Sequence, residues 1–192
     1  SKSETISFIN KNSMWNYLDD NTVPASSWKT VSFNDSGWKS GEGQLGYGDG
    51  DEITTLGYGG DANNKYITYY FRKEFMVSDP AGISSITINL LLDDGAVVYL
   101  NGNEIVRHNM PSETITSSTF ASTAIASETS YYSFTVNGIT LLAGENMIAV
   151  EAVNYDRFGS AGVNIYAELR TATDLTKIVS DATWEVASES PG

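Results

Sequence analysis

The chain has 192 residues, a formal net charge of −13 and no cysteine. This length fits one large β domain, or one domain with a tail, and the missing cysteines exclude disulfides and zinc–thiolate sites. The negative charge and the lack of any Lys/Arg cluster argue against nucleic acid and anionic membranes as partners, and no run of 18 apolar residues predicts a transmembrane helix.

Short strands and turns are predicted in the first 40 residues. Ile6 and Phe8 indicate an edge strand, and Trp15 and Tyr17 share one face of the next strand. Residues 24–28 begin with Pro and fit one helical turn. The first 20 residues lack the basic start and apolar centre of a signal peptide, and the chain begins without Met, so we expect a piece of a longer protein.

Residues 41–65 form the longest predicted irregular stretch, GEGQLGYGDGDEITTLGYGGDANNK. Loops of this length are uncommon in compact domains unless they are functional or ordered by a metal. Asp49 and Asp51 flank a glycine, with Glu52 or Asp61 nearby, so these carboxylates are candidate ligands of a structural Ca²⁺. Solvated turn aspartates are the alternative reading. The stretch has no GxxxxGK[ST] motif for a phosphate loop.

Strands dominate the middle of the chain. Residues 66–77 predict a central strand, since neither of its faces is cleanly polar. Residues 84–109 predict a meander of three strands, with a break at Asp93-Asp94-Gly95 and a type I′ hairpin at Asn101-Gly102.

After the meander we expect a long connection over residues 108–130 and then three more strands. These strands are predicted at residues 131–136, 147–153 and 163–170. Glu151 is the one charged residue in its strand, so we expect it to pair with Arg72 inside the sandwich or to bind a metal.

The predicted fold class is all-β, an antiparallel β-sandwich. Residues 1–170 form the sandwich module, and residues 171–192 are a tail, a linker or the start of a following module. Following strand directions along the chain brings four connections to one end of the sandwich. They are residues 41–65, 93–95, 108–130 and 154–162.

Side chains at this end suit a sugar, because aromatic faces stack on pyranose rings while carboxylates, amides and guanidinium groups bond hydroxyls. The candidate ligand-binding residues are Tyr47, Asp93, Asp94, His108, Asn154, Tyr155 and Arg157. Tyr155 and Arg157 are the strongest of these. Asp93 and Asp94 can instead be turn formers, and a lone His is more often a structural hydrogen-bonding group.

Five segments resemble a known family. They are FNDSGW, LGYGDGDEITTLGYGG, YITYYFRKEF, LLLDDGAVVYLNGNEIVRHNMP and LLAGENMIAVEAVNY. Over roughly residues 15–170 the chain resembles the galactose-binding-domain-like jelly-roll modules of secreted bacterial proteins. The D-D-G-x-x-x-Y-x-N-G element is also similar to the sugar-binding domain of β-galactosidase-type enzymes. The resemblance implies an extracellular location, other domains in the parent chain and, often, a structural Ca²⁺.

The predicted function is a non-catalytic carbohydrate-binding module that targets a secreted enzyme to a polysaccharide or oligosaccharide. The alternative is a structural or adhesive spacer of a bacterial surface protein. The chain is not expected to be an enzyme, because it has no GxSxG, no HExxH and no cysteine nucleophile.

Overall fold

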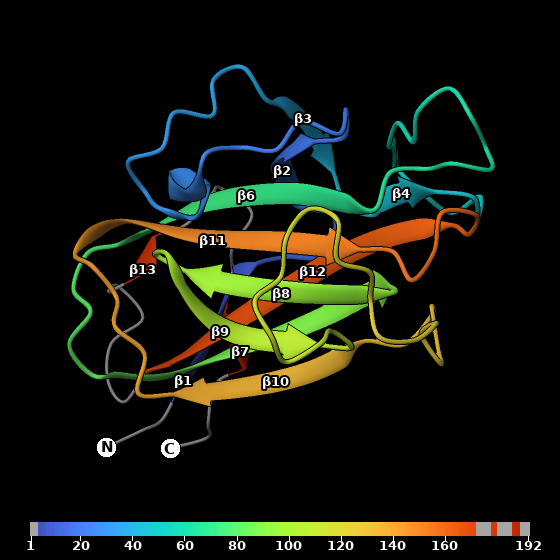
Figure 1. The fold of residues 1–192 in the computed structure, drawn as a ribbon. Helices are drawn as coiled ribbons and strands as arrows, with labels where there is room; N and C mark the ends of the chain where they lie inside the picture. Colours follow the sequence, from blue (N-terminus) through green and yellow to red (C-terminus); the bar gives the residue numbers. More distant parts are fainter. Residues whose placement is uncertain (1–3, 172–177, 180–185, 189–192) are drawn as a thin grey trace.

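A computed structural model describes residues 4–171, 178–179 and 186–188 of the chain, which form two facing β-sheets (Figure 1). The predicted all-β sandwich is confirmed. Most strand pairs are antiparallel; β4 and β5 run parallel. The described part of the chain holds one helix, the 3₁₀ turn η1 (Ser26–Lys29), and no helix there is long and apolar enough to cross a membrane.

The first sheet has the order β10-β7-β12-β1-β14, and β4 and β5 extend it beside β12. Its strands are β1 (Glu4–Ile9), β4 (Leu45–Tyr47), β5 (Thr54–Thr55), β7 (Ile83–Asp93), β10 (Tyr132–Asn137), β12 (Ala161–Thr171) and β14 (Val186–Ser188). The long β12 is central because it pairs with β7, β1 and β4.

The second sheet has the order β3-β2-β6-β11-β8-β9, with β13 paired to β6. Its strands are β2 (Met14–Leu18), β3 (Lys39–Glu42), β6 (Thr68–Val77), β8 (Gly95–Leu100), β9 (Asn103–His108), β11 (Gly144–Val153) and β13 (Ile178–Val179). As predicted, β6 is a central strand, flanked by β2 and β11.

The main core lies between the sheets. Phe8, Trp15, Phe75, Ile88 and Ile148, from strands of both sheets, are almost completely buried there. Phe8 and Phe75 pack with ring centroids 4.5 Å apart across the two sheets. The period-2 apolar pattern read from the sequence is therefore the pattern of the inner faces.

A second apolar cluster covers the outer face of the second sheet. Trp28 of η1 is 3% exposed and packs edge-on against Tyr70 and Tyr99, at 5.0 and 5.8 Å. Trp38 stacks beside Trp28. The connection between β2 and β3 thus acts as a lid, and for this reason β8 is buried on both faces.

The predicted three-stranded meander is wrong in its pairing, although all three strands form. β7 pairs with β10 and β12 in the first sheet, whereas β8 pairs with β9 and β11 in the second. Only Asp94 separates β7 from β8, which is too short for a two-residue hairpin loop. The chain therefore turns a corner into the facing sheet. The hairpin at Asn101-Gly102 is confirmed, with φ of 50° and 91°.

Two further expectations need correction. The stretch 41–65 is not wholly irregular, because Leu45–Tyr47 is buried and pairs with Ala161–Val163 of β12. The expected pair of Glu151 with Arg72 does not form. Both lie on the outer face of the second sheet, where Arg72 contacts Asp35 and the Glu151 carboxylate accepts a hydrogen bond from Tyr99 at 2.9 Å.

The tail beyond residue 171 contributes to both sheets where the structure describes it. Residues 178–179 pair with Met76 and Val77, and residues 186–188 pair with β1. The remaining tail residues lie outside the described ranges.

Candidate functional site

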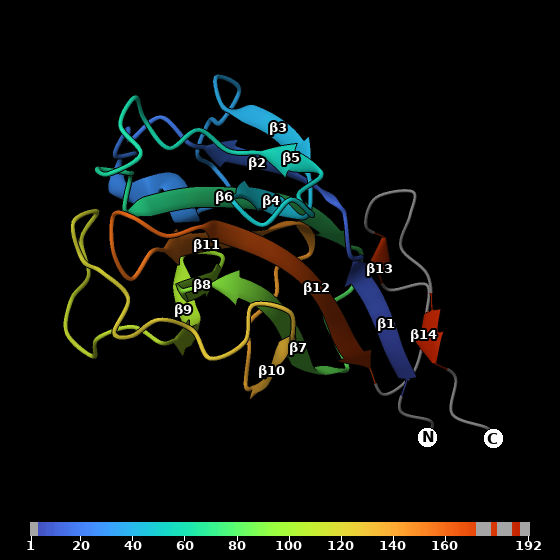
Figure 2. The same cartoon turned by 90° about the vertical axis from the view of Figure 1, so that its right-hand side faces the viewer.

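Three connections meet at one end of the sandwich, which we call the loop end. They are residues 48–67, 109–131 and 154–160, and Asp93 and Asp94 lie beneath them. In Figure 2 the three connections project toward the same side, at the left. The Lys65 amide donates to the Arg157 carbonyl at 3.0 Å, which joins the first connection to the last. Strand direction alone predicted this meeting of loops.

Asp94 ties two of these connections together. Its buried carboxylate accepts hydrogen bonds from the backbone amides of Ile125, at 2.9 Å, and Tyr155, at 2.8 Å. The Asn109 side chain donates to the Asp94 carbonyl and to that of Thr123. Since both carboxylate oxygens are used, Asp94 holds the loops in place and does not face solvent.

Asn154 and Tyr47 form a second tie. The buried Asn154 amide donates to the Tyr47 hydroxyl and to the Tyr66 carbonyl, each at 3.0 Å. Tyr47 is itself buried and packs on Tyr58, with ring centroids 5.1 Å apart. Asn154 and Tyr47, both predicted ligand residues, therefore lie buried inside the loop end and are not exposed on its surface.

An open groove with a volume of about 520 Å³ lies on the surface of the loop end. Its lining residues are Phe120, Ala121, Tyr155, Asp156, Arg157 and Phe158. Phe158 is 64% exposed and Tyr155 is 44% exposed. The Arg157 guanidinium lies 5.8 Å from the centre of the Phe120 ring. Among the candidate ligand residues, Tyr155 and Arg157 are the two that line this groove.

His108 lies apart from the groove, at the end of β9. Its ring packs against Tyr132 and Phe134 of β10, at 4.5 and 5.4 Å. Its Nε2 atom is buried and has no hydrogen-bond partner in the described part of the chain. Burial lowers the pKa of His108, so the neutral imidazole fills the gap between the two edge strands.

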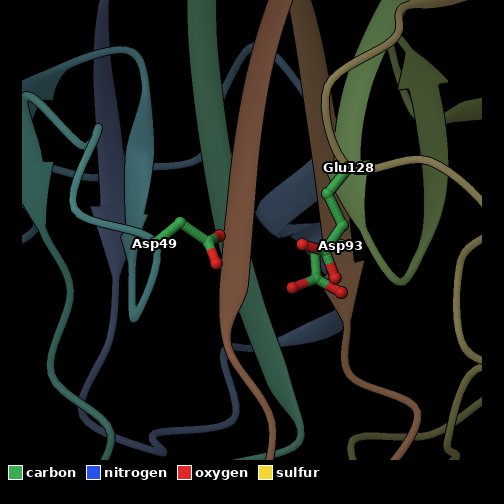
Figure 3. A group of neighbouring side chains, drawn as sticks. All are labelled: Asp49, Asp93 and Glu128. Atoms are coloured by element: carbon green, nitrogen blue, oxygen red, sulfur yellow. The ribbon is translucent and has the colours of Figure 1, made fainter.

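An acidic cluster lies beneath the loops. Asp49, Asp93 and Glu128 come from three different segments, and one oxygen of each lies within 4.8 Å of the others (Figure 3). Asp93 is 6% exposed and accepts a hydrogen bond from the Ser160 hydroxyl at 2.7 Å. Carboxylate oxygens are ligands of Ca²⁺, and these three could supply part of the roughly six to eight that the ion takes.

Burial raises the pKa of all three acids. Burial, together with a hydrogen bond to Asp94, raises the pKa of Asp93 from 3.8 to about 8. Burial raises the pKa of Glu128, and the charges of Asp49 and Asp94 add to this effect. Burial likewise raises the pKa of Asp49, against a lowering hydrogen bond from Ser160. A bound divalent cation would relieve this crowding.

Of the other predicted metal ligands, Asp51 lies in a carboxylate group and Asp61 does not. Asp49 and Asp51 form a second group with Glu52, and the Glu52 carboxylate accepts the amides of Asp49 and Gly50 at 2.9 and 3.0 Å. Asp61 belongs to neither group of carboxylates. It accepts the Asn63 amide in a local turn.

Sequence reasoning missed several members of the site. Glu128 lies in a long polar connection, where nothing in the sequence distinguishes it from Glu113. Phe120 and Phe158 are lone aromatic residues in loops. That pattern signals exposure, but it does not reveal that the two rings line one groove.

A scan with protein-family models found no match, and neither did a search of the curated proteins. Among solved structures the chain is similar to a β-glucuronidase from glycoside hydrolase family 2, at 17% identity and a TM-score of 0.56, with 88% of this chain and 18% of that chain covered. It is also similar to a β-glycosidase from Bacteroides vulgatus, at 18% identity and a TM-score of 0.51, with 86% and 20% covered.

A third similar structure is a calcium-binding mutant of Bacteroides uniformis β-glucuronidase 2, at 15% identity and a TM-score of 0.51, with 87% and 18% covered. At these identities the likeness shows the fold alone. The chain spans about a fifth of the length of these proteins. Its fold is that of a sandwich domain found within multidomain glycoside hydrolases.

Proposed function

We propose that this chain is a non-catalytic carbohydrate-binding module of a secreted, multidomain bacterial glycoside hydrolase. The observation that carries the proposal is the open aromatic groove at the loop end, with Tyr155 and Phe158 exposed on a single loop. The small share of the similar enzymes that the chain spans also favours an accessory role over a catalytic one.

The groove fits the chemistry of a saccharide. Exposed rings offer faces on which the C–H surface of a pyranose stacks, and binding sites are generally apolar concavities with a few polar groups. The loop is braced from below by Asp94 and Asn154, so ligand binding would order little new structure. Because the loop is already held in place, little conformational entropy is lost on binding, and this favours binding by a groove of small area.

Structural Ca²⁺ forms a second part of the proposal. Asp49, Asp93 and Glu128 would hold the ion and join the first and second connections to the end of β7. The ion would displace the proton that Asp93 retains, place positive charge between the three acids, and so stabilise the loops that carry the groove.

Affinity electrophoresis in gels containing soluble polysaccharides, together with a glycan array, tests the saccharide proposal. The variants Tyr155→Ala and Phe158→Ala remove the exposed rings, and Met14→Ala, an exposed apolar residue of β2, is the matched control. We expect at least one glycan to retard the wild type and the control, with at least about tenfold weaker binding by either groove variant. Retention of the wild type on no glycan would overturn the proposal.

A further inference from the structure

Arg157 is an unpaired cation in a strongly acidic chain. The ion pairs within the described residues are Lys39–Asp19, Arg72–Asp35 and Arg107–Glu104. Arg157 has no such partner among those residues. Its guanidinium donates one hydrogen bond, from Nη1 to the Lys65 carbonyl at 3.2 Å, and otherwise lies against the Phe120 ring.

The neighbouring acid, Asp156, forms no ion pair with Arg157 within the described residues. Oδ1 of Asp156 accepts the backbone amides of Phe158 and Gly159, both at 2.9 Å, and this closes the turn of the loop. One oxygen of the carboxylate closest in sequence thus bonds the backbone of its own loop. Nε and Nη2 of Arg157 have no protein acceptor in the described part of the chain, and the residue lines the open groove.

We propose that Arg157 binds the carboxylate of an acidic sugar whose ring stacks on the aromatic residues of the groove. This inference rests on the proposed function and names the ligand class of the same site. The planar guanidinium presents parallel N–H donors that match the two oxygens of a carboxylate, and such bidentate pairs are stronger and more directional than bonds to hydroxyls.

The position of the charge favours an acidic sugar over a neutral one. The Phe120 ring packs against the Arg157 guanidinium, and the hydrogen bond from Nη1 to the Lys65 carbonyl holds the guanidinium in place. The side chain therefore loses little freedom when it binds. The net charge of −13 opposes anions at long range, but this repulsion is screened over about 8 Å at physiological salt, so recognition depends on the local contact.

Matched oligosaccharides test the inference. The first pair is a pentamer of galacturonic acid and its carboxyl-reduced product. The second pair is cellopentaose and its C6-oxidised derivative. Binding of all four is measured by calorimetry at 50 and 300 mM NaCl with wild type, Arg157→Gln, Arg157→Lys and Lys11→Gln. The last variant removes the same charge from an exposed residue outside the groove.

We expect the wild type and Lys11→Gln to bind at least one acidic oligosaccharide about tenfold or more tightly than its neutral partner. Arg157→Gln should abolish this ratio, and Arg157→Lys should retain part of it, because the charge remains without the planar fork. An unchanged melting temperature in Arg157→Gln separates lost recognition from lost folding.

Equal binding of acid and neutral partner overturns the inference and leaves the saccharide proposal standing. An acid preference that survives in Arg157→Gln also overturns it, because the carboxylate is then bound elsewhere. If none of the four oligosaccharides binds while the glycan array detects a neutral ligand, the acidic-sugar assignment fails alone. If the array is also blank, both proposals fail.

Discussion

Replacing Asp93 by Asn should remove most of the pH dependence of stability that arises at the loop end. The native state holds a proton on Asp93 up to a pKa of about 8, whereas the ordinary pKa of an Asp side chain is 3.8. Asparagine is the uncharged isostere of the protonated acid, so it can keep the contact with Ser160 at no cost in charge.

The sign and the size of this pH effect on stability follow from the difference between the pKa of Asp93 in the folded and the unfolded chain. A carboxyl group whose pKa is raised by folding contributes stability that is fully present below about pH 4 and is lost as the pH rises to about 8. Each pH unit between these limits lowers the free energy of unfolding by about 1.4 kcal/mol. The upper limit for the whole interval is therefore about 6 kcal/mol.

The assay is urea unfolding, followed by tryptophan fluorescence, at pH 5, 7 and 9 in EDTA and in millimolar Ca²⁺. Wild type in EDTA should lose stability from pH 5 to pH 9, while Asp93→Asn changes much less. At pH 9, a Ca²⁺ concentration of 100 times the dissociation constant should raise the free energy of unfolding of the wild type by about 2.7 kcal/mol. The same Ca²⁺ should leave the stability of Asp93→Asn unchanged. Asp61→Asn, outside both carboxylate groups, is the control.

A wild-type stability that is flat between pH 5 and pH 9 in EDTA would refute the reasoning about Asp93. An effect of Ca²⁺ that persists in Asp93→Asn would locate the ion elsewhere. If Ca²⁺ leaves the wild type unchanged at every pH, the calcium proposal is wrong and the proton linkage still stands.

Three other substitutions have defined outcomes. Burial raises the pKa of Glu151, and Glu151→Gln can still accept the hydrogen bond from the Tyr99 hydroxyl. This substitution should therefore raise the melting temperature at pH 8 and have little effect on it near pH 4. An equal rise in melting temperature at both pH values would contradict this. Burial lowers the pKa of His108, so His108→Phe should remove the stability loss as the pH falls below about 6.5; melting curves at pH 5 and 8 check it. Trp28→Ala should cost about 3–5 kcal/mol in urea unfolding, and a cost below 1 kcal/mol would show that the lid over the second sheet is dispensable.

The strands were predictable because each carries its own signal. Alternating apolar residues from Ile86 to Leu92, and the Asn101-Gly102 dipeptide, specify local structure without reference to the rest of the chain. Pairing was less predictable. The passage of the chain from β7 to β8 depends on which sheet has room for each strand. Burial of Val97 and Tyr99 beneath Trp28 identifies β8 as a strand covered on both faces, and this is a tertiary fact.

In the candidate site, too, one part could be predicted from the sequence and another part depends on tertiary contacts. Strand direction predicted which loops meet, because it needs only the order and number of reversals. It could not predict what each polar side chain does once there. Asp94 and Asn154 look like ligand groups in the sequence, but their hydrogen-bonding capacity is used by backbone and side-chain partners inside the loop end.

This internal use of polar groups bears on where a ligand can bind. A loop cluster without regular pairing must satisfy its own backbone groups, and buried carboxylates and amides are the side chains able to do so. Polar residues at the loop end are therefore divided between bracing the loops and contacting a ligand. Asp94 and Asn154 brace them, which leaves the exposed Tyr155 and the unpaired Arg157 to meet a ligand. Substituting the bracing residues should reduce stability and binding together, whereas substituting the groove residues should reduce binding alone.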